Sequence, residues 1–146
     1  MPEWTNLSYA NVATTSPTAH RASSDWAESL ARGGAAEFEA EAEKNGMMPL
    51  RLAASRLLSC DVADVCVGSS ATELLCSIAW AMSPREGTNV VSTRSSFPST
   101  VYPWARVADQ NGAEIRLAEH DENLYTDPSD LLSLIDEDTS VVTVSH

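Results

Sequence analysis

Residues 62–93 read VADVCVG, SSATELLCSIAWAM, SPREG and TNVVST in turn, and they alternate between two hydrophobic patterns. The first and last of these blocks are short valine-rich runs, which predict buried strands. The block that begins at Ser69 has apolar residues at helical spacing and predicts a helix. A strand, a helix and a second strand in this order predict a crossover between parallel strands.

The same alternation continues to the last residue. We expect a helix that begins irregularly around Pro103 and ends at Gly112, and a later helix that is capped by Asp127 with Pro128 in its first turn. These two helices are expected over 98–112 and 127–136, and strands are expected over 113–119 and 139–146. The fold class is therefore α/β, with four strands in a mostly parallel sheet covered on both faces.

The region before the first strand predicts an arm followed by helices. Residues 1–23 show no sustained period and predict an extended arm or loop. We expect a helix from the N-cap Ser24, with a break at the Gly33-Gly34 pair and an acidic solvated face beyond it. A second helix over 49–58 carries an apolar stripe. This stripe consists of Leu50, Ala53, Ala54, Leu57 and Leu58.

The length of 146 residues fits one domain, which we place at 24–146 behind the arm. The final strand stops at His146, at the sheet edge where such folds bind ligands. A complete domain would cover this strand with a loop and a helix. We therefore expect the chain to be the N-terminal part of a longer one.

Composition excludes several classes of function. With 43% hydrophobic and 21% charged residues the chain can bury a core, and its formal charge of −12 argues against nucleic acids and anionic membranes as partners. No signal or membrane segment is evident, so we expect a soluble, cytoplasmic protein. The three cysteines form no CxxC pair and the three histidines are scattered, so neither a disulfide framework nor a metal site is expected.

The segment from Gly68 to Glu73 is the first candidate site, because it joins a predicted strand to a predicted helix. Small residues allow close approach of a ligand, and amides at a helix N-terminus bind phosphate. Ser69, Ser70 and Thr72 add hydroxyl groups. The same residues can also form an ordinary helix cap with Glu73 behind it. Spacing alone leaves both interpretations open.

The second candidate lies at Ser95-Ser96-Phe97-Pro98-Ser99, after the next predicted strand. The proline favours an extended Phe97, whose ring can then project from the carboxyl end of the strand. Such a ring suits stacking on a planar cofactor. The alternative is a core phenylalanine, which the residue pattern taken alone favours.

Four segments in order resemble the N-terminal portion of the class V aminotransferase and cysteine desulfurase superfamily. Residues 6–17 (NLSYANVATTSP) resemble its opening motif, and Gly68 to Glu73 resemble its Ser-Gly-Ala-Thr-Glu phosphate loop. Phe97-Pro98-Ser99 falls where the family stacks a side chain on the pyridine ring. Residues 141–146 (VVTVSH) resemble a strand that ends in a Ser/Met-His-Val segment.

The resemblance implies the type I fold of pyridoxal 5'-phosphate enzymes, an amino acid substrate and a homodimer. It implies cofactor binding by Ser70, Ala71, Thr72 and Phe97. It also implies that the substrate is bordered by Asn11, Thr14 and Thr15. The reaction would be amino-group transfer, β-elimination or a related step. A non-catalytic α/β module that binds a phosphorylated ligand or a protein partner through the same loop is the alternative.

Three departures from the family pattern narrow the prediction. Phe97 stands where desulfurases usually have a histidine. A phenyl ring can stack but cannot donate or accept a proton, so this position favours the other lyase and aminotransferase branches of the superfamily. Cys76 replaces an asparagine common in the phosphate helix. The Schiff-base lysine of the family has no counterpart, because the single lysine, Lys44, lies in the acidic helix. We therefore expect the chain alone to be inactive.

Overall fold

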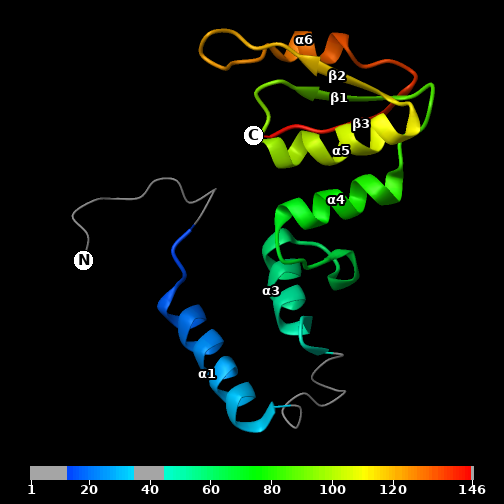
Figure 1. The fold of residues 1–146 in the computed structure, drawn as a ribbon. Helices are drawn as coiled ribbons and strands as arrows, with labels where there is room; N and C mark the ends of the chain where they lie inside the picture. The colour runs from blue at the N-terminus through cyan, green and yellow to red at the C-terminus, as the bar shows by residue number, and fades with distance from the viewer. Residues whose placement is uncertain (1–12, 35–44, 146) are drawn as a thin grey trace. The chain divides into compact units, whose positions relative to one another are not determined.

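The computed structural model describes residues 13–34 and 45–145, and the chain divides into two compact units, Met1–Cys66 and Val67–His146. The second unit alternates helices and strands, as the sequence predicts from Ser69 onward (Figure 1). Its elements are α4 (Ala71–Met82), β1 (Asn89–Thr93), α5 (Pro98–Asn111), β2 (Glu114–Ala118), α6 (Pro128–Ser133) and β3 (Thr139–Val142).

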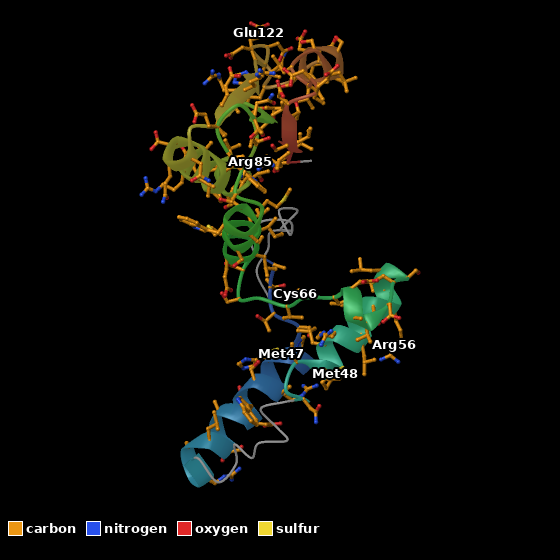
Figure 2. The ribbon with its side chains drawn as sticks, turned by 90° about the vertical axis from the view of Figure 1, so that its right-hand side faces the viewer. Met47, Met48, Arg56, Cys66, Arg85 and Glu122 are labelled. Atoms are coloured by element: carbon orange, nitrogen blue, oxygen red, sulfur yellow. The ribbon has the colours of Figure 1, made fainter. Side chains whose placement is uncertain are left out.

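The three strands form one parallel sheet in the order β2-β1-β3. The chain leaves β1 toward one neighbour and returns to the other side of it, so the two crossovers run in opposite directions. Right-handed crossovers of opposite direction place their helices on opposite faces of a sheet. Accordingly, α5 and α6 lie on opposite sides of the strands (Figures 1 and 2).

The core of the second unit extends from the central strand across α5 to α4. Ala79, Val90, Trp104 and Val107 are buried together, each 3% exposed or less. Two partly buried residues of the outer strands, Ile115 and Val141, pack against this cluster. Both pair with Val90 in the sheet register, so one row of side chains carries the core across all three strands.

The helix α5 is continuous through Pro103, so the expected irregular start is absent. A proline lacks the N–H that would bond the carbonyl four residues before it, but burial of Pro103 against the core offsets that loss. The helix ends as predicted, with Gly112 in the left-handed conformation at a φ of 77°. The cap of α6 by Asp127 is likewise confirmed.

In the first unit, the helix α1 (Pro17–Gly33) begins before the expected start at Ser24. The side chain of Ser16 accepts a hydrogen bond from the amide of Ala19 at 3.1 Å, and Pro17 occupies the first turn, where its missing N–H costs nothing. The prediction of an extended arm was therefore wrong for residues 17–23. The break at Gly34 is confirmed, whereas the acidic segment beyond it lies outside the described residues.

The second helix of this unit, α3 (Met48–Leu58), matches its predicted bounds closely. Its apolar stripe, however, is not buried against other described residues of the chain. The side chains of Leu50, Leu57 and Leu58 are exposed by 53%, 85% and 67%. The helix is therefore as the sequence predicts, and within the first unit the three leucines of its stripe are exposed.

The segment 62–68 is not the buried strand that its valines predict. Val62–Asp64 forms a short 3-10 helix (η2), for which Asp61 provides the N-cap. The guanidinium of Arg51 donates to the carbonyls of Val62 at 2.8 Å and Val65 at 2.9 Å. Arg51 therefore satisfies these two carbonyls, which need no neighbouring strand as a hydrogen-bond partner. The described sheet accordingly has three strands instead of the predicted four.

No helix among the described residues is long and apolar enough to span a membrane.

Candidate functional site

The loop before α4 forms a reciprocal helix cap. The hydroxyl of Ser70 accepts the amide of Glu73 at 3.2 Å. The Glu73 carboxylate accepts the backbone amide of Ser69 at 2.7 Å and its hydroxyl at 2.6 Å. These bonds from the Ser69 side chain and backbone lower the pKa of Glu73 and keep it ionised. The helix-cap interpretation of the loop is therefore confirmed, while phosphate binding stays a prediction.

Gly68 allows the loop to approach α4 closely. A Cβ atom at this position would lie 2.8 Å from Cδ2 and 2.9 Å from Cγ of Leu74, and 3.3 Å from a carboxylate oxygen of Glu73. A side chain there would force Leu74 and the capping carboxylate to move. The glycine is thus required by the packing of the loop on the first turn of the helix.

The cap leaves several hydrogen-bond donors at the amino end of α4. The amides of Ala71 and Thr72 belong to the first turn and have no carbonyl of their own helix to bond. Ser70, Ala71 and Thr72 are all exposed. Exposed amides at the positive end of a helix dipole can bind an anion. The carboxylate of Glu73 faces Ser69 and accepts hydrogen bonds from both the amide and the hydroxyl of that residue.

Phe97 lies between β1 and α5, where it serves as the residue before the helical Pro98. Its backbone is extended, with φ −57° and ψ 135°, as expected for a residue that precedes proline. Its side chain is 56% exposed. The alternative of a core phenylalanine is therefore wrong for this chain, and the ring is available for contact with a ligand.

The two candidate segments are neighbours in space. The hydroxyl of Thr72, in the first turn of α4, donates to the hydroxyl of Ser99, in the first turn of α5, at 2.9 Å. The amino ends of the two helices therefore meet, and the loop that precedes α4 lies beside the segment that follows β1. Nothing in the sequence indicated this contact, because the two residues are 27 positions apart.

A groove of about 330 Å³ starts at this contact and runs between α4 and α5. Its walls are mostly apolar, and the side chains of Trp80 and Tyr102 along it are 55% and 70% exposed. The residues that line the groove are Thr72, Cys76, Trp80, Pro98, Ser99, Tyr102, Pro103 and Arg106.

Hydroxyl groups that the sequence analysis did not single out fix the carboxyl end of the sheet. Ser92 is buried, and its hydroxyl donates to the carbonyl of Thr143 at 2.6 Å, which links β1 to the end of β3. The hydroxyls of Thr93 and Ser96 are 2.7 Å apart, and the turn that contains Ser96 leads directly into Phe97. These bonds hold the start of α5 relative to the strands. The available signal in the sequence was the group of serine and threonine residues at the end of β1 and directly after it.

The residues predicted to border the substrate lie in the first unit or outside the described residues. Thr14 and Thr15 belong to the first unit and are exposed. Asn11, Lys44 and His146 lie outside the described residues. Cys76, the predicted departure from the family, lies in the groove and is partly buried. Within 13–34 and 45–145, no group of three or more histidine, cysteine, aspartate or glutamate side chains is placed to hold a metal ion.

The fold is similar to part of a known enzyme structure. The crystal structure of the cysteine desulfurase CsdA (S-sulfonic acid) from Escherichia coli matches 93% of this chain, with a TM-score of 0.57 and 18% sequence identity. This chain spans only 30% of the length of that desulfurase chain. The described unit with its three parallel strands corresponds to part of the type I fold of pyridoxal phosphate enzymes.

Sequence comparison identifies the family directly. No curated protein sequence matches the chain significantly. The profile of the family described as aminotransferase class-V, in contrast, matches residues 14–146, which is most of the chain. This match and the type I fold agree with the family resemblance, and the match includes the three resembling segments from Gly68 onward. The chain therefore belongs to the class-V aminotransferase family.

Proposed function

We propose that this chain forms the N-terminal part of a pyridoxal phosphate-dependent aminotransferase or lyase that acts on an amino acid. The hydrogen bond between Thr72 and Ser99 carries the proposal, because it joins the phosphate-loop candidate to the segment of the exposed aromatic ring. The family to which the chain belongs uses this cofactor, which requires a phosphate site and a ring site close together. We further propose a cytoplasmic homodimer.

The donors at the amino end of α4 fit a phosphate group. The amides of Ala71 and Thr72 can donate to phosphate oxygens, and the hydroxyls of Ser70 and Thr72 can turn toward the same place. Two helices present their positive ends here, because α5 begins next to Thr72. The amides and hydroxyls at this place would thus hold a phosphate by hydrogen bonds and by the helix dipoles.

Phe97 would hold the ring of the cofactor by stacking. Its extended backbone and exposed side chain allow a flat contact at the carboxyl end of β1. Because a phenyl ring neither donates nor accepts a proton, Phe97 would orient the ring and exclude water, without acid or base catalysis. The cofactor, when bound, supplies an electron sink for the substrate carbon that it activates. Asn11, Thr14 and Thr15 would border the substrate.

Ligand binding tests the proposal without relying on catalysis. We would titrate the full-length apo protein with pyridoxine 5'-phosphate, which has an alcohol in place of the aldehyde and cannot react with a lysine. Pyridoxine serves as the ligand that lacks the phosphate. Calorimetry should show tighter binding of the phosphorylated form, and Thr72→Val should raise its Kd several-fold, which corresponds to the loss of about 1 kcal/mol.

The matched control is Ser77→Ala, which removes an exposed hydroxyl from the same helix, where it donates to the carbonyl of Glu73 at 3.0 Å. This variant should bind both ligands like the wild type. Equal affinity for inorganic phosphate and for pyridoxine 5'-phosphate would favour a non-catalytic module that recognises phosphorylated ligands. If binding does not depend on the phosphate, or if Thr72→Val leaves the Kd unchanged, the loop only caps the helix and does not bind phosphate.

A further inference from the structure

Ser99 takes part in the contact at the helix amino ends, although no role has been assigned to it so far. It is the second residue of α5, as Thr72 is the second residue of α4. Its side chain is partly buried, whereas Thr72 is exposed. In the structure its hydroxyl oxygen accepts a hydrogen bond from the hydroxyl of Thr72 at 2.9 Å. No other hydrogen bond of the Ser99 hydroxyl occurs within the described part of the second unit.

The direction of this bond matters for anion binding. A hydroxyl has one proton to donate but can accept two hydrogen bonds. Phosphate oxygens at neutral pH mainly accept, so Thr72 must turn its proton to the phosphate in order to bind it. The bond to Ser99 can then reverse, because the free proton of Ser99 can be donated to the oxygen of Thr72. A hydroxyl that accepts one hydrogen bond donates a stronger one.

We propose that Ser99 is a positioning residue for the phosphate group, acting through Thr72. With a phosphate bound, the Ser99 hydroxyl donates to Thr72 and Thr72 donates to the phosphate. Ser99 thereby fixes the rotamer of Thr72 and polarises its hydroxyl. This inference rests on the proposed function, since it requires a phosphate at the amino end of α4.

A double-mutant cycle with full-length apo protein tests the coupling of the two hydroxyls. The Kd of pyridoxine 5'-phosphate and of pyridoxine would be measured for the wild type, Ser99→Ala, Thr72→Val and the double variant. We expect Ser99→Ala to weaken binding of the phosphorylated ligand about three- to tenfold, as for one neutral hydrogen bond, and to leave pyridoxine unchanged. In the Thr72→Val background the same substitution should have no further effect. Ser99→Thr, which keeps the hydroxyl, should restore the wild-type Kd.

Each other outcome overturns the inference in a recognisable way. An unchanged Kd in Ser99→Ala, with normal phosphate-dependent binding by the wild type, removes Ser99 from the site and leaves the proposed function intact. Equal losses in both backgrounds mean that Ser99 acts independently of Thr72. A parallel loss of pyridoxine affinity means that the substitution disturbs the packing of α4 on α5. A wild-type protein without phosphate-dependent binding overturns the proposed function and the role of Ser99 together.

Discussion

Asn89 and Asp136 are joined side chain to side chain, with Nδ2 of Asn89 donating to Oδ1 of Asp136 at 2.8 Å. The amide oxygen of Asn89 accepts the hydroxyl of Thr139 at 2.8 Å, and Arg116 of β2 donates to the other oxygen of Asp136. Asn89 begins the central strand and is 1% exposed. The amino ends of β1 and β3 are thus fastened to each other and to the middle of β2, at the edge opposite to the candidate site.

Replacement of Asn89 by alanine should destabilise the fold. The substitution leaves Asp136 and Thr139 each without one partner and opens a small cavity at a buried position. We expect a loss of about 1 to 3 kcal/mol in the free energy of unfolding, measured by urea denaturation. Asn123→Ala, in the exposed loop after β2, is the matched control and should leave the urea midpoint unchanged. Equal midpoints for the two variants would contradict a structural role of Asn89.

Acid should weaken the fold through Asp136. Hydrogen bonds from Arg116 and Asn89 lower the pKa of Asp136 from 3.8 to about 2. Because the folded pKa lies below the unfolded one, this group stabilises the fold fully above its unfolded pKa. The contribution is lost as the pH falls from about 4 through about 2.

The variant Asp136→Asn isolates this contribution from other carboxylates with a lowered pKa, such as Glu73, Asp121 and Asp127. The difference in unfolding free energy between wild type and variant should be largest above pH 4 and should shrink as the pH approaches 2. Denaturation at a series of pH values measures it. Glu122→Gln, in the exposed loop after β2, serves as the control. A difference that stays constant with pH would show that Asp136 acts through shape rather than charge.

Replacement of Phe97 by leucine should weaken cofactor binding modestly. Loss of stacking removes about 0.5 to 1.5 kcal/mol, so the Kd should rise between about two- and tenfold. Because Phe97 would touch the ring and not the phosphate, pyridoxine 5'-phosphate and pyridoxine should be affected alike. This pattern differs from that expected for Thr72 and Ser99, which should change only the phosphorylated ligand.

Tyr125→Leu provides the control for Phe97, since Tyr125 is an exposed aromatic residue of the loop after β2 and does not line the groove. It should leave both dissociation constants unchanged. Complete loss of binding in Phe97→Leu would assign more than stacking to this ring, and an unchanged Kd would remove it from the site. Near-ultraviolet circular dichroism of each variant would report whether the aromatic packing of α5 is intact.

The second unit could be predicted well from sequence because its signals are local. The Gly112 end of α5 and the Asp127 cap of α6 depend on neighbouring residues, and the structure shows both. The valine-rich segment 62–68 was mistaken for a strand because its conformation depends on Arg51, which lies 14 positions before the carbonyl of Val65 that it bonds. A periodic pattern contains no information about such a distant donor.

The candidate site shows the same division between local and distant contacts. Residue types alone indicated the capping box of Ser69, Ser70 and Glu73, because all its members lie within one helical turn. The bond between Thr72 and Ser99 depends on how two helices cross, which residue types do not specify. The exposure of Phe97 likewise depends on what the rest of the unit covers.

The strand order β2-β1-β3 has a consequence for synthesis on the ribosome. The strand β1 lies in the middle of the sheet, yet both of its partners follow it in the chain. Its amides and valines therefore leave the exit tunnel before any residue that will pair with them exists outside. One edge of β1 can pair once β2 has emerged, but its other edge stays unpaired until residue 142 is outside, and an unpaired strand edge makes a nascent chain prone to aggregate.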